Sequence, residues 1–318
     1  MLENWPAYTY GLNYSELAND TLRKYKNNLN FHSFIKKYEP AGDYLNWGSN
    51  KKFKETPTHQ FDSNGIPILK YGNVFYYSPV TVSQFALTLH GRYKRGEDTV
   101  SLFIKTIDLL ADLQDSTGAL PFPFIFHYYR KVFQPGWVSG VAQGQALSAY
   151  ARAYEVTKNK KYIKKGNNCL DFLVKPIEKG GTLTSLKGID ESLTNYIIFE
   201  EYPVEPSSYT LNGFLFTLLG LYDWWKLTKD GNKKYALVAE KYFSEGIKTL
   251  KRILHYYDIG GYTTYDLAHI VYKIDPKISG NYHAIHIYLL HALYTVTGDK
   301  VLRDFANLWA SYVRKKEN

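Results

Sequence analysis

Apolar residues along most of this chain recur with the spacing of an α-helix. A helix has 3.6 residues per turn, so apolar positions three and four apart line one face. One such stripe runs through Leu211, Phe214, Leu215, Leu218, Leu219, Tyr222 and Trp225. Two more consist of Tyr235, Ala239, Tyr242, Gly246 and Leu250, and of Leu302, Phe305, Trp309 and Tyr312. From residue 78 onward the pattern predicts helices.

The predicted helices come in pairs that repeat. Short polar junctions at 92–97, 157–160, 228–232 and 297–299 interrupt the apolar stripes, and the last three recur at intervals of about 70 residues. A period of this length, one αα-hairpin plus a connection, is typical of hairpins arranged around an axis. We therefore predict a mainly α fold, an α/α toroid (an incomplete α/α barrel). Its four hairpins are expected at about 79–115, 140–175, 210–254 and 282–315.

The chain before residue 78 follows a different pattern. Ile66, Ile68, Val74 and Tyr76 alternate with other residues around a Gly-Asn turn, which predicts a small β-hairpin over 65–77. A helix is predicted over 15–34, and loops over 39–48 and 51–58. We expect residues 1–77 to pack on a catalytic domain formed by 78–318.

The connections between hairpins are long, at about 116–139, 176–209 and 255–281. The turns within hairpins are short and rich in lysine. In a toroid the two sets lie at opposite rims, and long loops within a compact domain are usually functional. The long connections carry tyrosines, histidines and acidic residues, so we expect the active cleft at their rim.

The composition of the chain indicates what kind of partner and location to expect. The chain holds 30 Tyr, 17 Phe and 6 Trp among 318 residues, and its net charge is +9. Tyrosine covers apolar surface with a polar tip, which suits a wide, wet cleft as well as a core. The charge favours an anionic partner, but no nucleic-acid motif accompanies it. Cys169 is the only cysteine, and neither a signal-peptide core nor a membrane-spanning run is visible, so a cytoplasmic location is expected.

The connection over 199–214 has the sequence FEEYPVEPSSYTLNGF. Pro203 and Pro206 keep the residues before them out of helical geometry. The carboxylate of Glu201 and the phenol of Tyr202 are thus held on an extended segment at the mouth of a helix. Catalytic groups are often placed on such segments. A proline-rich surface connector is the alternative interpretation.

Because the motifs of other reaction classes are absent, acid/base chemistry by a carboxylate and phenols is the remaining interpretation. The sequence shows no Ser–His–Asp order, nucleophile elbow or phosphate loop. His283 and His286 share a helix face, but no further metal ligands stand at a recognised spacing, so we expect capping or packing roles and no metal or cofactor. Phenols have a reference pKa near 10. They suit proton transfer at a weakly acidic C–H beside a carboxylate, where the enolate-like intermediate needs hydrogen-bond donors.

Four segments in this order resemble the D-glucuronyl C5-epimerase family, in the domain that carries its active site. They are residues 76–87, the GW-x4-AQGQA motif at 136–146, the EEYP-x2-PSS-x3-NG motif at 200–213, and the pair TYDLAH (264–269) and YHAIH (282–286). The resemblance covers roughly residues 62–315. The family pattern usually places arginine before the histidine of TYDLAH, where this chain has Ala268.

The resemblance implies inversion of glucuronate to iduronate at C5 within an acidic glycan, without a cofactor. Glu201 and Tyr282 map onto the acid/base positions on opposite faces of the sugar, and Tyr202 and Tyr265 onto assisting positions. Arg130 is our preferred substitute for the missing arginine, because arginine grips carboxylates bidentately, and His269 and Lys273 are others. Gln143 either binds sugar or packs a helix start, and Asn212 either binds substrate or is structural. His286 completes the expected substrate-binding set, and Tyr77 and Gln84 are expected in the scaffold.

Three other functions fit the same residues. A polysaccharide lyase shares removal of the C5 proton but then expels the 4-oxygen. An inverting glycoside hydrolase needs a second carboxylate beside Glu201, for which Asp266 and Asp115 are candidates. A non-catalytic module binds an acidic glycan without turnover. A homodimer is a further expectation, and Trp47, Trp224 and Trp225 fit either its interface or the core.

Overall fold

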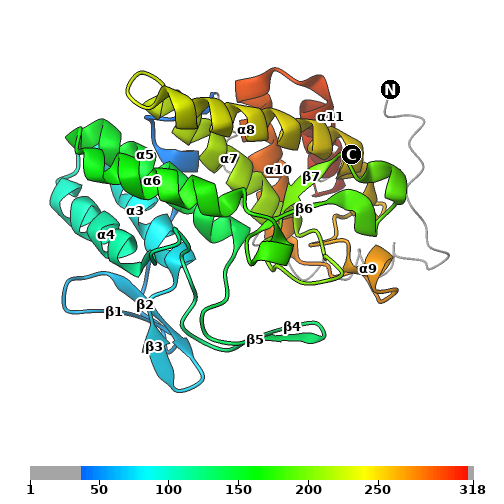
Figure 1. Ribbon diagram of the computed structural model, residues 1–318, viewed down its shortest axis with the longest axis horizontal. Helices are drawn as coiled ribbons and strands as arrows, with labels where there is room; N and C mark the ends of the chain where they lie inside the picture. The colour runs from blue at the N-terminus through cyan, green and yellow to red at the C-terminus, as the bar shows by residue number, and fades with distance from the viewer. Residues whose placement is uncertain (1–36, 314–318) are drawn as a thin grey trace, which may run out of the picture.

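The computed structural model describes residues 37–313, and Figure 1 shows its helices and strands. The helix predicted over 15–34 lies outside the described residues. The prediction of a mainly helical protein with a small β-hairpin before its helix pairs is confirmed. Four helix pairs follow one another along the chain, each close to a predicted hairpin. They are α3 (Pro79–Lys94) with α4 (Val100–Leu113), α5 (Gly140–Thr157) with α6 (Lys160–Leu173), α7 (Leu211–Thr228) with α8 (Lys233–Ile253), and α10 (Gly280–Thr297) with α11 (Lys300–Val313).

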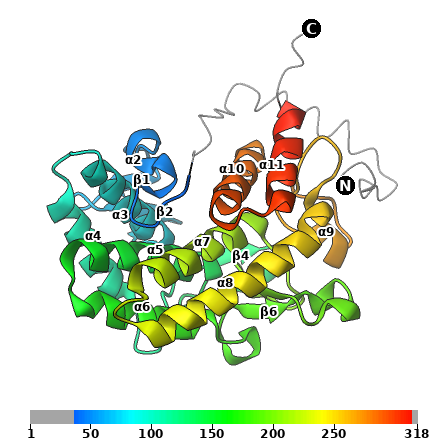
Figure 2. The ribbon, with the colours of Figure 1, turned by 90° about the horizontal axis from the view of Figure 1, so that it is seen from above.

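The first helix of each pair belongs to an inner layer. Helix α5 packs against both α3 and α7, and α7 also packs against α10. Residues 140–153 of α5 are all buried, whereas α6 and α8 bury one face and lie outside (Figure 2). A Cβ added at Gly144 would lie 2.5 Å from Cα of Thr217, so glycine permits the close approach of α5 and α7. This is a two-layer helical arrangement, and its closure into a toroid stays a prediction.

Within residues 37–313, three small antiparallel sheets flank the helices. The predicted hairpin is present as β2 (Pro67–Tyr71) and β3 (Val74–Tyr76), and Gly72 in its turn has a φ of 61°. An additional strand, β1 (His59–Phe61), pairs with β2. The long connections contain the two other sheets, β4 (Phe126–Tyr128) with β5 (Lys131–Phe133) and β6 (Leu183–Ser185) with β7 (Ile197–Phe199).

Short helical turns complete the connections. Predicted loop 39–48 instead contains η1 (Tyr44–Asn46) and the start of α2 (Trp47–Asn50), because this segment packs on α3. The remaining turns are η2 (Ile177–Lys179), η3 (Leu186–Gly188), η4 (Glu191–Leu193), η5 (Leu254–Tyr257) and α9 (Ala268–Val271). Figure 1 shows the α5–α6 and α7–α8 turns at one end of the helices and the sheets β4–β5 and β6–β7 toward the other, as predicted for the two kinds of connection.

A buried polar cluster ties the segment before α3 to the inner helices. The phenol of Tyr38 donates a hydrogen bond to Oδ2 of Asp223 in α7 at 2.8 Å. Asp223 also forms an ion pair with Arg152 of α5, and both side chains are fully buried. Because a buried charge is costly without its partner, we assign this cluster to scaffold stability. The division of the chain at residue 77 stays a prediction.

Within residues 37–313, no helix has the length and apolar character needed to cross a membrane. The cytoplasmic location stays a prediction.

Candidate active site

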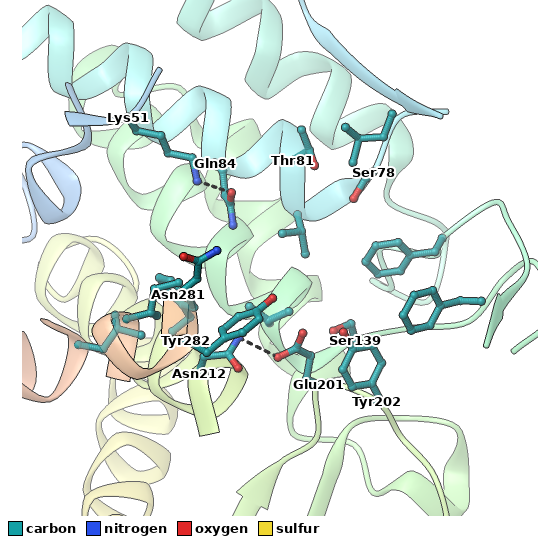
Figure 3. A pocket seen from close by; sticks show the side chains of 18 of the residues that line it. Lys51, Ser78, Thr81, Gln84, Ser139, Glu201, Tyr202, Asn212, Asn281 and Tyr282 are labelled. Carbon is teal, nitrogen blue, oxygen red and sulfur yellow. Dashed lines mark hydrogen bonds between the residues drawn. The ribbon is translucent and has the colours of Figure 1, made fainter. Parts of the chain in front are cut away.

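A cavity of about 540 Å³ opens between the inner helices and the small sheets. Figure 3 shows it closely. Its walls come from η1, α2 and Lys51, from β2, and from the starts of α3, α5, α7 and α10. The connections 116–139 and 176–209 supply the rest. Four of the residues predicted for catalysis or substrate binding line it: Glu201, Tyr202, Asn212 and Tyr282. Two of the three long connections contribute to the walls, in agreement with the predicted rim.

Tight backbone packing fixes the position of Glu201. Strand β7 ends just before Glu200, whose carbonyl accepts a hydrogen bond from the amide of Gly140 at 2.8 Å. A Cβ added at Gly213 would lie 2.5 Å from Oε2 of Glu201, so only glycine leaves room for this carboxyl. Nδ2 of Asn212 donates to the same oxygen at 3.1 Å. The Asn-Gly pair at the start of α7 therefore positions Glu201.

Three tyrosines from separate elements surround this carboxyl. The phenol of Tyr265 donates to Oε1 of Glu201 at 3.2 Å, and the hydroxyls of Tyr265 and Tyr202 lie 3.4 Å apart. The ring of Tyr282, on the first turn of α10, packs against that of Tyr265 with centroids 4.5 Å apart. The ring of Tyr202 stacks on Tyr128 of β4 with a centroid distance of 3.9 Å. The structure thus brings all four predicted catalytic side chains into one cluster.

Burial sets the protonation of the cluster. It raises the pKa of the Glu201 carboxyl to about 7, while hydrogen bonds from Tyr202, Tyr265 and Asn212 and the charge of Lys277 act in the opposite direction. Burial and the charge of Glu201 raise the pKa of Tyr282 to about 12. At neutral pH, the Glu201 carboxyl is therefore partly ionised, whereas the Tyr282 phenol is protonated.

Glu200 has a different environment from its neighbour. It is fully buried outside the cavity, and burial raises its pKa well above the usual range. The amide of Tyr209 donates to its Oε1 at 3.0 Å. Burial therefore favours the neutral form of Glu200, whose hydrogen bond from Tyr209 helps to fix the loop before α7.

Four residues predicted to bind substrate lie outside the cavity. Arg130 is exposed at the turn between β4 and β5. Gln143 is buried in α5 and donates to the carbonyl of Gly118 at 3.0 Å, which matches the packing alternative for its motif. His269 is buried on α9, and His286 is buried in α10. Their predicted contacts with substrate stay untested.

The two α10 histidines serve packing. Nδ1 of His283 accepts a hydrogen bond from the amide of Thr263 at 3.1 Å, and its Nε2 lies 3.1 Å from the carbonyl of Trp309. The hydroxyl of Thr263 lies 3.0 Å from Nδ1 of His286. Burial lowers the pKa of His283 to about 4. Among residues 37–313, no three His, Cys, Asp or Glu side chains cluster as metal ligands would.

Sequence reasoning missed much of the cavity wall. Lys51 and Gln84 both line it, although the sequence placed the first in a loop and the second in the scaffold. Aromatic walls are supplied by Trp47, Tyr71, Phe122, Phe126, Trp137 and Tyr288. Phe122 and Phe126 belong to the long connection that the sequence placed at the active rim, and Trp137 belongs to the GW-x4-AQGQA motif. Trp47, Tyr71 and Tyr288 carry no such signal. By contrast, Trp224 is fully buried in the core.

Known proteins resemble this chain in the region that forms the cavity. A family model described as the D-glucuronyl C5-epimerase C-terminus matches residues 114–311, which include Glu201, Tyr265 and Tyr282. The chain belongs to the D-glucuronyl C5-epimerase family. A D-glucuronyl C5-epimerase of Caenorhabditis elegans is 32% identical over 232 residues, which cover 70% of this chain and 36% of the relative. An uncharacterized protein of Methanocaldococcus jannaschii is 30% identical over 174 residues, or 55% of this chain and 52% of that protein.

The matched region thus spans about a third of the worm relative and about half of the archaeal one. Membership in the D-glucuronyl C5-epimerase family supports an epimerase at the level of the reaction class. Within this family member, Ala268 is buried beside Asp266, and its amide donates to Oδ1 of that residue at 3.1 Å. Position 268 therefore supplies no charge to the substrate.

Proposed function

We propose that this protein inverts C5 of D-glucuronate residues in a glycan to give L-iduronate. The observation that carries the proposal is the cluster of Glu201 with three tyrosine phenols at one end of an aromatic-walled cavity. A glycan containing uronates is the expected substrate, because aromatic rings pack on sugar faces and the chain carries a net charge of +9.

The first step removes the C5 proton. The ionised Glu201 carboxylate takes the proton, and the electron pair of the C5–H bond moves into the adjacent carboxylate to form an enolate-like dianion. A carboxyl with a pKa of about 7 is a stronger base than an ordinary glutamate and remains partly ionised at neutral pH. Tyr265 and Asn212 hold its two oxygens, which fixes the direction of attack.

The second step returns a proton to the opposite face of C5. The Tyr282 phenol donates its proton, the C5–H bond re-forms with inverted configuration, and the phenolate regains a proton from solvent while Glu201 releases its own. Tyr282 remains protonated until this step because its pKa is about 12. The hydroxyl of Tyr202, which lies on the cavity wall 3.4 Å from that of Tyr265, supplies a hydrogen-bond donor beside the developing charge.

Two observations favour this reaction over glycoside hydrolysis. The carboxylate of Asp266 accepts hydrogen bonds from the phenols of Tyr128 and Tyr129, each at 2.8 Å to Oδ2, and is not part of the cavity wall. Asp115 accepts from Thr117 in a turn and also lies outside that wall. Neither candidate carboxylate thus faces the cavity with Glu201, as an inverting hydrolase requires.

Product analysis tests the proposal. We expect incubation of a glucuronate-containing oligosaccharide with the protein in D₂O to place deuterium at C5 without shortening the chain. Unsaturated, ultraviolet-absorbing ends would instead establish a lyase, and new reducing ends a hydrolase.

A further inference from the structure

The cavity holds an ammonium group that faces no carboxylate in the described part of the chain. Lys51 follows directly after α2, whose last turn fixes its backbone through a hydrogen bond from its amide to the carbonyl of Trp47 at 2.9 Å. Its Nζ donates to Oε1 of Gln84 in α3 and lies 4.1 Å from the ring centroid of Trp47. These partners are a neutral amide and an aromatic face.

The surroundings of Lys51 leave its charge uncompensated. Among residues 37–313, no Asp or Glu oxygen lies within ion-pair distance of its Nζ. Burial alone lowers its pKa to about 7, with no contribution from a neighbouring acid. A charged group withdrawn from water without an opposite charge is costly to the fold unless a ligand supplies that charge.

The position of Lys51 places it within the substrate cavity but away from the acid/base cluster. In Figure 3, Lys51 and Gln84 lie on one side of the cavity, Glu201 and Tyr202 on the opposite side, and Tyr282 and Asn281 between them. A second hollow of about 360 Å³ shares Lys51 and Gln84 with the cavity and is also lined by Lys52, Lys54 and His59. Lys51 therefore lies between the lysine-lined hollow and the cavity that contains Glu201.

We propose that Lys51 and Gln84 form a carboxylate-binding subsite that holds an acidic group of the glycan opposite Glu201. The Lys51 ammonium supplies the charge, and the Gln84 amide both orients it and offers Nε2 as a second donor. The bound carboxylate belongs either to the reacting uronate or to a neighbouring one, and both are recognised by the same chemistry. The inference rests on the proposed function for the identity of the ligand as a uronate glycan.

Binding measurements test this subsite without requiring turnover. Calorimetry would compare the wild type with Lys51→Met, which keeps the apolar stem over Trp47 but removes the charge. The probes are a tetrasaccharide with two glucuronates, a fragment with one, and their carboxyl-reduced counterparts. We expect Lys51→Met to weaken binding of the acidic tetrasaccharide by about 10- to 100-fold and to leave its reduced counterpart unaffected. Lys51→Arg should restore most of the affinity.

Lys226 provides a matched control, because its Nζ lies 3.4 Å from the ring centroid of Trp225 and it is not part of the cavity wall. Lys226→Met should bind every probe as the wild type does. If Lys51→Met weakens binding of the single-glucuronate fragment, the carboxylate at the subsite is that of the reacting uronate. If only binding of the tetrasaccharide is weakened, the carboxylate is that of a neighbouring uronate. Equal binding of the acidic probes by Lys51→Met and wild type would overturn the subsite, as would equal losses for acidic and reduced probes. Intact binding without C5 exchange would instead count against the proposed function alone.

Discussion

The phenol of Tyr265 donates a hydrogen bond to Oε1 of Glu201 at 3.2 Å, across 64 positions of sequence. The contact joins two long connections, one before α7 and one before α10. Asn212 holds the other oxygen of the same carboxyl. Glu201 is therefore oriented by two donors from different parts of the chain while burial keeps its pKa near 7. This arrangement is what a directed base at the wall of a cavity requires.

Glu201→Gln should lower the rate of C5 exchange by about 10²- to 10⁴-fold, the usual effect of losing a general base. The amide keeps the size of the side chain but cannot accept the proton. Substrate affinity should remain within about tenfold, or roughly 1.4 kcal/mol. Deuterium incorporation at C5 measures the rate, and calorimetry measures affinity.

Glu200→Gln is the matched control for that variant. Burial raises the pKa of Glu200 well above the usual range and so favours its protonated form, which glutamine matches in size and in charge. We expect wild-type exchange. If Glu200→Gln lost exchange while Glu201→Gln retained it, the two adjacent carboxyls would have the reverse of the roles assigned here.

Tyr282→Phe should abolish inversion, with a loss of about 10²- to 10⁴-fold in iduronate formation. Phenylalanine retains the ring that packs on Tyr265 but has no proton to deliver. Tyr77→Phe is the control, because the pKa of Tyr77 is also raised to about 12 but its phenol donates to Asp62 outside the cavity. If Tyr282→Phe inverted C5 at the wild-type rate, this phenol would be excluded as the proton donor of the second step.

The pH dependence of stability reports the raised pKa of Glu201 directly. An unfolded glutamate ionises near pH 4.5, whereas the folded one ionises near 7. The folded state is therefore favoured below pH 4.5, and stability is lost as pH rises from 4.5 through 7. The loss approaches about 3 kcal/mol at pH 8, at about 1.4 kcal/mol per pKa unit.

Glu201→Gln removes this titration. Its unfolding free energy relative to wild type should therefore increase between pH 5 and pH 8, as denaturant titrations at the two pH values would show. In parallel, kcat/KM of the wild type should rise with pH through about 7, because the base is the ionised form. An unchanged difference in stability between the two pH values would show that Glu201 has an ordinary pKa.

Gly213→Ala should lower kcat without unfolding the protein. Alanine is the better helix former, but its Cβ would meet Oε2 of Glu201 at 2.5 Å and displace the carboxyl. Gly246→Ala, in α8, is the control because its Cβ would meet Leu218 and not Glu201. It should affect thermal stability and leave kcat unchanged. Equal kcat values for Gly213→Ala and wild type would mean that the reaction does not depend on the position that Gly213 allows the Glu201 carboxyl to take.

The helical part of the fold was predictable because its signal is long and periodic. Stripes such as that from Leu211 to Trp225 extend over several turns, and the polar junctions between them fall at regular intervals. The small sheets in the connections escaped prediction because strands such as β4 (Phe126–Tyr128) have only three residues, too few to show an alternation. Their aromatic side chains nevertheless pointed to the correct rim.

The acid/base cluster was also predictable, whereas the opposite wall was not. Glu201, Tyr265 and Tyr282 stand in motifs that resemble a known family. Lys51 stands in a short segment without a motif, and its place in the cavity depends on how η1 and α2 pack against α3. Arg130, the cation preferred from the sequence, lies at an exposed turn, and its contact with substrate stays a prediction. Distances between separate loops set such positions, and one sequence does not encode them in a readable pattern.

Inversion at C5 is the central claim, and NMR of a defined glucuronate-containing oligosaccharide in D₂O tests it most directly. With the wild-type protein we predict iduronate signals, deuterium at C5 and a glycan of unchanged length. Persistence of the C5 proton in a glycan that demonstrably binds, or the appearance of unsaturated or new reducing ends, would contradict the assignment of Glu201 and Tyr282 as the two acid/base groups of an epimerase.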